Sequence, residues 1–123
     1  LWPGSGQKDE TGGFNNIINI PVDPETDGEK IKIIFNNSIL PKLESFKPEL
    51  LIISAGFDAH ADDPLANLNL VEEDYAWITH KLCDVAEKYC NGRLVSSLEG
   101  GYNLEALAAS VAAHVNVLME RSK

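Results

Sequence analysis

The sequence predicts an α/β fold in which a parallel sheet lies between layers of helices, an α/β/α arrangement. Two short apolar runs, at residues 50–54 and 93–98, lack the alternation of polar and apolar side chains that a half-exposed strand shows. Each run is followed by a segment with helical periodicity. This alternation of strand and helix favours parallel strands joined by helices. The 123 residues are enough for one modest core.

The first part of the chain predicts a loop and then a short strand. Residues 1–13 are rich in glycine and polar side chains, which is typical of a loop. Residues 14–22 alternate loosely and contain three isoleucines, which favours a strand. We expect this strand to end at Pro21 or Pro24, because proline cannot donate a hydrogen bond to a neighbouring strand.

A helix is predicted to follow, up to about Phe46. Thr26 and Glu29 have the spacing of a capping box, in which each residue's side chain accepts a hydrogen bond from the backbone of the other. Apolar residues then recur at helical spacing. Pro41 lies inside this span and should kink or divide the helix, because proline removes one helical hydrogen bond.

Two further helices flank the second apolar run. The first extends from about Glu72 to Cys90 and begins with three acidic residues, which suit the positive end of the helix dipole. Gly92 is well placed to end it. The second begins after Asn103, a residue that favours the N-cap position, and continues with a clear 3.6-residue apolar stripe.

Composition narrows the classes of function. The formal net charge of −9 argues against binding to nucleic acid, whose phosphates would be repelled. No apolar run reaches the roughly 18 residues that a membrane span needs, so we expect no membrane association. Cys83 and Cys90 are too far apart along one helix for a disulfide, and we expect free thiols in the reducing cytoplasm.

Two polar side chains follow the buried strands. Asp58 comes after the first strand and Tyr102 after the second, so both should lie on the same edge of the parallel sheet, where ligands bind in such folds. Asp58 is consistent with a metal ligand, a general base, or a cap or turn residue. Tyr102 is equally consistent with a hydroxyl in a pocket or a ring that packs its loop on the sheet.

The other candidates are weaker. His60 is two residues from Asp58 and is a candidate second metal ligand, whereas His80 and His114 fall in helices and are predicted to face solvent. Gly100 and Gly101 allow close backbone approach to a ligand, but the glycine spacing of a dinucleotide-binding loop is absent. A nucleotide-binding domain is therefore a weak alternative. The pair Asp62 and Asp63, with Pro64 after it, predicts an ordered loop.

Three segments, in series, resemble motifs of the histone deacetylase superfamily. Residues 54–66 (SAGFDAHADDPLA) resemble its zinc-ligand loop, and residues 98–104 (LEGGYNL) resemble its catalytic-tyrosine loop. Residues 2–6 (WPGSG) resemble its aromatic-Pro-Gly-Thr-Gly loop, with serine in place of threonine. The forms Gly-Phe-Asp and Glu-Gly-Gly-Tyr are similar to the class II and bacterial amidohydrolase branch. The resemblance covers nearly the whole chain.

This resemblance implies that residues 1–123 form the C-terminal part of a single domain with the arginase–deacetylase fold. Asp58 would be one ligand of a catalytic Zn²⁺, and the hydroxyl of Tyr102 would donate a hydrogen bond to the substrate carbonyl oxygen. The channel for the acylated chain would be formed in part by Leu65, Gly100, Gly101 and Trp2. The implied reaction is hydrolysis of an acetylated amine, such as protein acetyl-lysine, a polyamine or a small amine, with release of acetate.

The resemblance also implies that part of the active site lies outside these residues. The family's other zinc ligands and its His-His general base would precede Leu1. We therefore expect the 123-residue chain alone to be inactive, to lack stoichiometric zinc at this site, and to self-associate or depend on a partner for stability. The rival hypothesis is a degenerate or truncated relative that acts as a non-catalytic binding or regulatory module.

Overall fold

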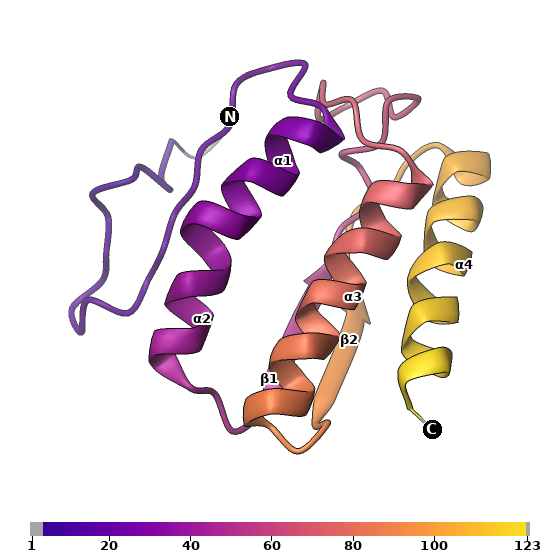
Figure 1. Cartoon of the computed structure of the whole chain (residues 1–123). Coiled ribbons are helices and arrows are strands. Elements are labelled where there is room, and N and C mark those ends of the chain that lie inside the picture. Colours follow the sequence, from indigo (N-terminus) through magenta and orange to yellow (C-terminus); the bar gives the residue numbers. More distant parts are fainter. Residues whose placement is uncertain (1–3, 123) are drawn as a thin grey trace.

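A computed structural model describes residues 4–122 and contains a short sheet with helices on one side of it (Figure 1). The elements are, in chain order, helix α1 (Gly28–Ile34), π-helix η1 (Phe35–Ile39), helix α2 (Leu40–Phe46), strand β1 (Leu51–Ala55), helix α3 (Glu72–Tyr89), strand β2 (Leu94–Leu98) and helix α4 (Leu104–Arg121). No helix of the described residues is long and apolar enough to cross a membrane.

Strands β1 and β2 pair in parallel. Leu51 lies opposite Leu94 at one end of the pair, and Ala55 lies opposite Leu98 at the other. Helix α3 makes the connection between them, because parallel strands need a long crossover. The predicted parallel α/β fold is therefore confirmed, and both strands end at the same edge of the sheet.

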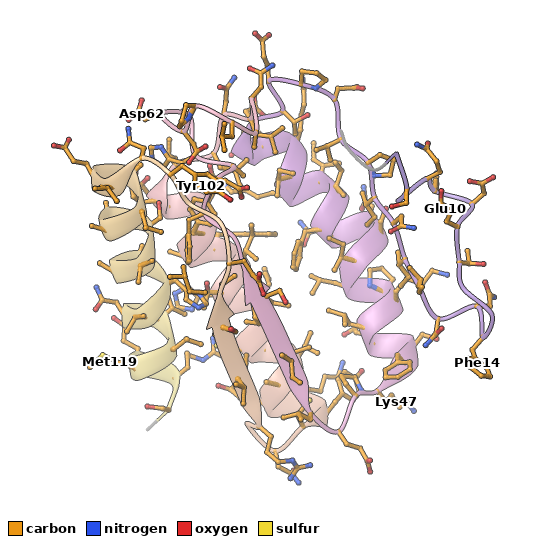
Figure 2. The ribbon with its side chains drawn as sticks, turned by 180° about the vertical axis from the view of Figure 1, so that it is seen from behind. Glu10, Phe14, Lys47, Asp62, Tyr102 and Met119 are labelled. Atoms are coloured by element: carbon orange, nitrogen blue, oxygen red, sulfur yellow. The ribbon has the colours of Figure 1, made fainter. Side chains whose placement is uncertain are left out.

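One face of the sheet is covered and the other is bare in the described residues. Figure 2 shows the bare face in front, with the helices behind it. Successive side chains of a strand point to opposite faces, so Ala55 is buried against the helices while Ile52 on the bare face is 66% exposed. Val95 of β2 is 55% exposed. Of the three predicted layers, residues 4–122 supply the sheet and one helical layer.

The predicted strand over residues 14–22 is wrong, because this segment is a loop. The side-chain amide of Asn19 donates hydrogen bonds to the carbonyl oxygens of Gln7, at 3.0 Å, and Glu10, at 2.9 Å, and so closes the loop on itself. Ile17 and Ile18 are half exposed. No described strand pairs with this segment, and isoleucine content alone does not form a strand without such a neighbour.

The predicted capping box of the first helix is also wrong. Asp27 is the N-cap, and its carboxylate accepts a hydrogen bond from the backbone N–H of Lys30 at 3.0 Å. The hydroxyl of Thr26 instead donates to the carbonyl oxygen of Asp23 at 2.7 Å. Thr26 and Asp27 are adjacent and both favour the N-cap position, so the start of the helix shifts easily by one residue.

The predicted division of this helix near Pro41 is confirmed. The five residues of η1 are π-helical and separate α1 from α2, and Pro41 lies in the first turn of α2. Proline lacks the N–H for a helical hydrogen bond, and its ring crowds the carbonyl four residues earlier. The wider π turn just before it accommodates both effects.

The ends of the two long helices follow the sequence closely. Asn103 caps α4, and its side-chain oxygen accepts hydrogen bonds from the backbone N–H groups of Glu105 and Ala106. At the start of α3, the carboxylate of Asp74 accepts from the backbone N–H of Val71 at 3.0 Å. The valine cannot return a side-chain hydrogen bond, so only half of a capping box forms there.

His114 is buried, so the prediction that it faces solvent is wrong. Its Nδ1 lies 2.8 Å from the hydroxyl of Thr79 on α3, and its Nε2 lies 2.9 Å from the hydroxyl of Ser96 on β2. Thr79 donates its proton to the carbonyl oxygen of Tyr75, so it accepts from Nδ1–H, and Ser96 donates to Nε2. The neutral imidazole thus joins α4 to α3 and β2.

We expect this histidine to make stability depend on pH. Burial lowers the pKa of His114 in the folded chain, while the unfolded chain has the ordinary value of about 6.5. The unfolded state therefore binds more protons as the pH falls below about 6.5, and stability that is fully present above that pH is lost. Urea unfolding at about pH 5 and pH 7 should show a smaller pH dependence for His114→Gln than for the unsubstituted protein.

His80→Gln is the matched control, because His80 is a partly exposed histidine on α3. It should leave the difference in unfolding free energy between the two pH values unchanged. A pH dependence that survives in His114→Gln would mean that another group causes it.

Candidate active site

The ends of the two strands are joined by backbone hydrogen bonds. The N–H of Phe57 donates to the carbonyl oxygen of Gly100 at 2.7 Å, and the N–H of Glu99 donates to that of Ala55 at 2.9 Å. Each strand therefore continues to hold the other just beyond its last residue. The two loops that follow start from one rigid edge, as the sequence predicts for parallel strands.

Asp58 and Tyr102 meet at this edge, above Gly100. A Cβ atom built on Gly100 would lie 2.9 Å from Oδ2 of Asp58 and 3.3 Å from the hydroxyl oxygen of Tyr102. Both oxygens thus lie close to the same point, and they approach the backbone this closely because residue 100 is a glycine with no side chain. The sequence-based prediction that the carboxylate and the phenol share one edge is borne out by this geometry.

Gly101 has a different requirement. Its φ angle is +149°, a conformation that other residues rarely adopt. A Cβ atom there would also lie 2.6 Å from Cδ1 of Leu107 on α4. A glycine at this position lets the chain turn from β2 toward Tyr102 while α4 packs closely beneath it.

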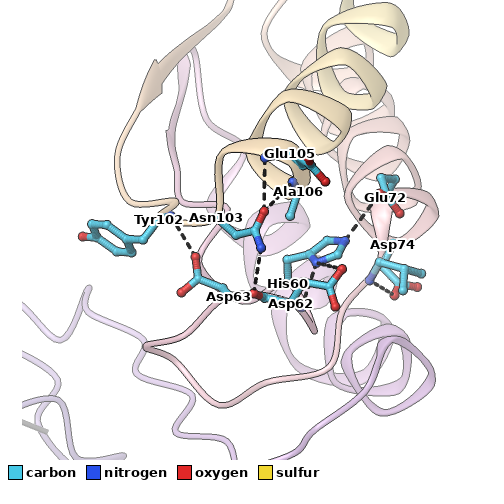
Figure 3. A network of polar contacts seen from close by, with 10 residues as sticks. His60, Asp62, Asp63, Glu72, Asp74, Tyr102, Asn103, Glu105 and Ala106 are labelled. Carbon is cyan, nitrogen blue, oxygen red and sulfur yellow. Dashed lines mark hydrogen bonds and ion pairs between the residues drawn. The ribbon is translucent and has the colours of Figure 1, made fainter.

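Asp63 connects the two loops (Figure 3). One carboxylate oxygen accepts a hydrogen bond from the backbone N–H of Tyr102 at 2.8 Å, and the other accepts from the backbone N–H of Leu65 at 3.0 Å. Desolvation by itself would raise the pKa of Asp63, but the backbone hydrogen bonds from Tyr102, Leu65 and Asn103 outweigh it and lower the pKa. The carboxylate is therefore ionised at neutral pH.

A buried phenol lies beneath the site. Tyr75 of α3 is 7% exposed, its ring centroid is 5.1 Å from that of Phe57, and its hydroxyl has no hydrogen-bond partner in the described residues. Burial, followed by the negative charge of Asp58, strongly raises the pKa of Tyr75. Tyr75 is therefore neutral. The sequence placed Tyr75 within the helix expected from Glu72 to Cys90 but gave no sign of the unpartnered hydroxyl.

His60 does not join Asp58 in a metal site. Residues 58–60 have the spacing Asp-x-His, but Nδ1 of His60 accepts a hydrogen bond from the backbone N–H of Asp62 at 3.0 Å. Its Nε2 lies 3.4 Å from a carboxylate oxygen of Glu72, too poorly aligned for a hydrogen bond. Nδ1 is thus occupied by the loop's own backbone, Nε2 lies nearest Glu72, and the ring is buried.

Of the predicted zinc ligands, residues 4–122 supply one, the carboxylate of Asp58. These residues contain no group of three or more histidine, cysteine, aspartate or glutamate side chains arranged to hold a metal ion. One carboxylate fits a single ligand position of a zinc site and cannot complete it. Of the four predicted channel residues, Leu65 is 62% exposed, Gly100 and Gly101 lie in the loop that leads to Tyr102, and Trp2 lies outside the described residues.

Comparison with known proteins identifies similar chains. The family described as "Histone deacetylase domain" matches residues 1–118. Type-2 histone deacetylase 1 of Dictyostelium discoideum is 50% identical over 105 residues, 85% of this chain and 7% of that protein. A probable deacetylase of Archaeoglobus fulgidus is 41% identical over 108 residues, 85% of this chain and 30% of that protein.

A solved structure is similar over almost the whole chain. The crystal structure of the HDA15 HD domain matches with a TM-score of 0.89 and 34% identity, covering 98% of this chain and 34% of that one. The chain therefore spans about a third or less of the length of these similar proteins.

Proposed function

The chain belongs to the histone deacetylase family, and we propose that it forms the C-terminal part of the catalytic domain of a zinc-dependent deacetylase. The observation that carries this proposal is the placement of the Asp58 carboxylate and the Tyr102 hydroxyl close together, both against Gly100. A carboxylate that holds a metal ion, with a phenol beside it, suits hydrolysis of an amide whose carbonyl oxygen meets the metal ion and the phenol hydroxyl.

In this proposal Asp58 is one ligand of Zn²⁺. No hydrogen bond or ion pair engages its side chain within residues 4–122, so its oxygens are available. A bound zinc ion polarises the amide carbonyl and lowers the pKa of water. The remaining ligands and the general base would come from residues that precede Leu1.

Tyr102 supplies a second electrophile. Its hydroxyl donates a hydrogen bond to the oxygen that becomes negatively charged as water attacks the carbonyl carbon. The backbone N–H of Tyr102 is bound to Asp63, and Gly100 and Gly101 would form part of the wall beside the acetylated chain. Leu65 and Trp2 would line the approach for the methylene chain of an acetylated amine.

The substrates we propose are acetylated amines: acetyl-lysine in a protein, an acetylated polyamine or a small acetylated amine. The buried free thiols Cys83 and Cys90 support the further proposal of a reducing, cytoplasmic location. Activity of the full-length protein against a panel of acetylated amines, with and without a chelator, tests the function. Absence of turnover on every substrate would favour the non-catalytic module instead.

The 123-residue chain alone should be inactive, should bind zinc below stoichiometry at this site and should self-associate. It offers one candidate zinc ligand, and Ile52 and Val95 leave apolar surface on the bare face of a sheet with unpaired edges. Metal analysis, a deacetylation assay and light scattering check these three outcomes. A monomeric, zinc-loaded, active chain would show that the ligands have been assigned wrongly.

A further inference from the structure

The loop that carries Tyr102 has few restraints of its own. Tyr102 is 56% exposed, so its ring is not held by packing. It follows Gly100 and Gly101, which restrict the backbone less than any other residues. The N–H of Tyr102 is held by the carboxylate of Asp63, which comes from the other loop and lies 39 positions earlier in the chain.

The same carboxylate also holds the loop of Leu65. Its second oxygen accepts from the N–H of Leu65 at 3.0 Å, so one side chain ties both loops together through two backbone hydrogen bonds. Asn103 adds a link between the same loops, since its side-chain amide donates to the carbonyl oxygen of Asp62 at 3.1 Å. Figure 3 shows the contact of Asp63 with Tyr102 and that of Asn103 with Asp62.

We propose that Asp63 is a positioning residue that holds the phenol of Tyr102 and the channel wall at Leu65 in register with each other. This inference rests on the proposed function, in which the Tyr102 hydroxyl must meet the reacting carbonyl oxygen. A backbone held by a carboxylate keeps the hydroxyl within reach of that oxygen, and small misplacements of a catalytic group lower turnover substantially. Asp63 itself does not touch the substrate.

Aspartate is the side chain that fits this role. An ionised carboxylate accepts hydrogen bonds on both oxygens, and such charge-assisted bonds are short, as the 2.8 Å bond to Tyr102 is. Asparagine has one oxygen and one NH₂ group, so Asp63→Asn can accept from only one of the two backbone N–H groups. Asp63→Ala can accept from neither.

The test uses the full-length, zinc-loaded protein with Asp63→Ala, Asp63→Asn and the control Asp62→Asn. The side chain of Asp62 is 74% exposed, and its closest charged contact is 4.0 Å from His60. We expect Asp63→Ala to lower kcat by about tenfold with zinc content and Tm nearly unchanged, and to speed hydrogen exchange at the amide of Tyr102. Asp63→Asn should lower kcat and speed this exchange by a smaller factor. Asp62→Asn should change neither kcat nor the exchange rate.

Two results would overturn the proposal. One is unchanged protection of the Tyr102 amide in both Asp63 variants, and the other is an unchanged kcat despite faster exchange. If Asp63→Ala does not fold, Asp63→Asn supplies the same two measurements. A full-length protein without deacetylase activity would contradict the proposed function, while the exchange of the Tyr102 amide would still decide whether Asp63 holds this loop.

Discussion

Tyr102→Phe in the full-length protein should lower kcat by about 10²-fold or more, with zinc content unchanged. The substitution removes the hydroxyl that we assign to the developing oxyanion, and loss of one such donor costs roughly this factor. The fold should not suffer, because the ring is 56% exposed and the bond to Asp63 uses the backbone N–H. Steady-state kinetics and metal analysis on the same preparation check both parts.

Tyr89→Phe is the control for this substitution. Tyr89 is a partly exposed tyrosine at the end of α3, so strand β2 separates it from the loop of Tyr102, and its ring lies beneath the ammonium group of Lys88. The Tyr89→Phe enzyme should have the same kcat as the unsubstituted enzyme. A Tyr102→Phe enzyme with normal kcat would remove Tyr102 from the reaction and leave it as a residue of the loop surface.

Asp58→Asn should lower zinc occupancy and activity together. An amide is a poorer zinc ligand than a carboxylate, and loss of one ligand weakens the whole site. The substitution preserves size, and no hydrogen bond or ion pair to the Asp58 side chain is found in residues 4–122, so we expect Tm of the metal-free protein to change little. Metal analysis, kinetics and thermal unfolding of the full-length protein separate these effects.

Asp62→Asn again serves as the control, since it makes the same chemical change four residues away at an exposed position. It should retain full zinc content and turnover. If Asp58→Asn also kept both, Asp58 would be a turn residue at the end of β1. A lowered Tm of the metal-free protein would likewise indicate a structural role.

Local sequence patterns determined most of the secondary structure and the shared position of the two site residues. The apolar runs gave both strands of the parallel pair, helical periodicity gave α3 to within one residue of its expected end at Cys90, and Asn103 marked the start of α4. Asn103 was predicted as a cap because its side chain bonds to backbone only two and three residues away. The shared position of Asp58 and Tyr102 followed as well, because parallel strands place their carboxyl ends at one edge of the sheet.

Tertiary structure alone decided the features that depend on distant neighbours. Residues 14–22 have strand-like composition but form a loop closed by Asn19, because a strand exists only where another strand can pair with it. His114 is buried because Thr79 and Ser96, which lie 35 and 18 positions away, satisfy both of its ring nitrogens.

The link through Asp63 is of the same kind. The sequence indicated an ordered loop around it, but the partner, the backbone N–H of Tyr102, lies 39 residues away. Periodicity and capping preferences describe contacts within a few residues along the chain. Hydrogen bonds between loops depend on how the strands bring those loops together, so only the folded chain specifies them.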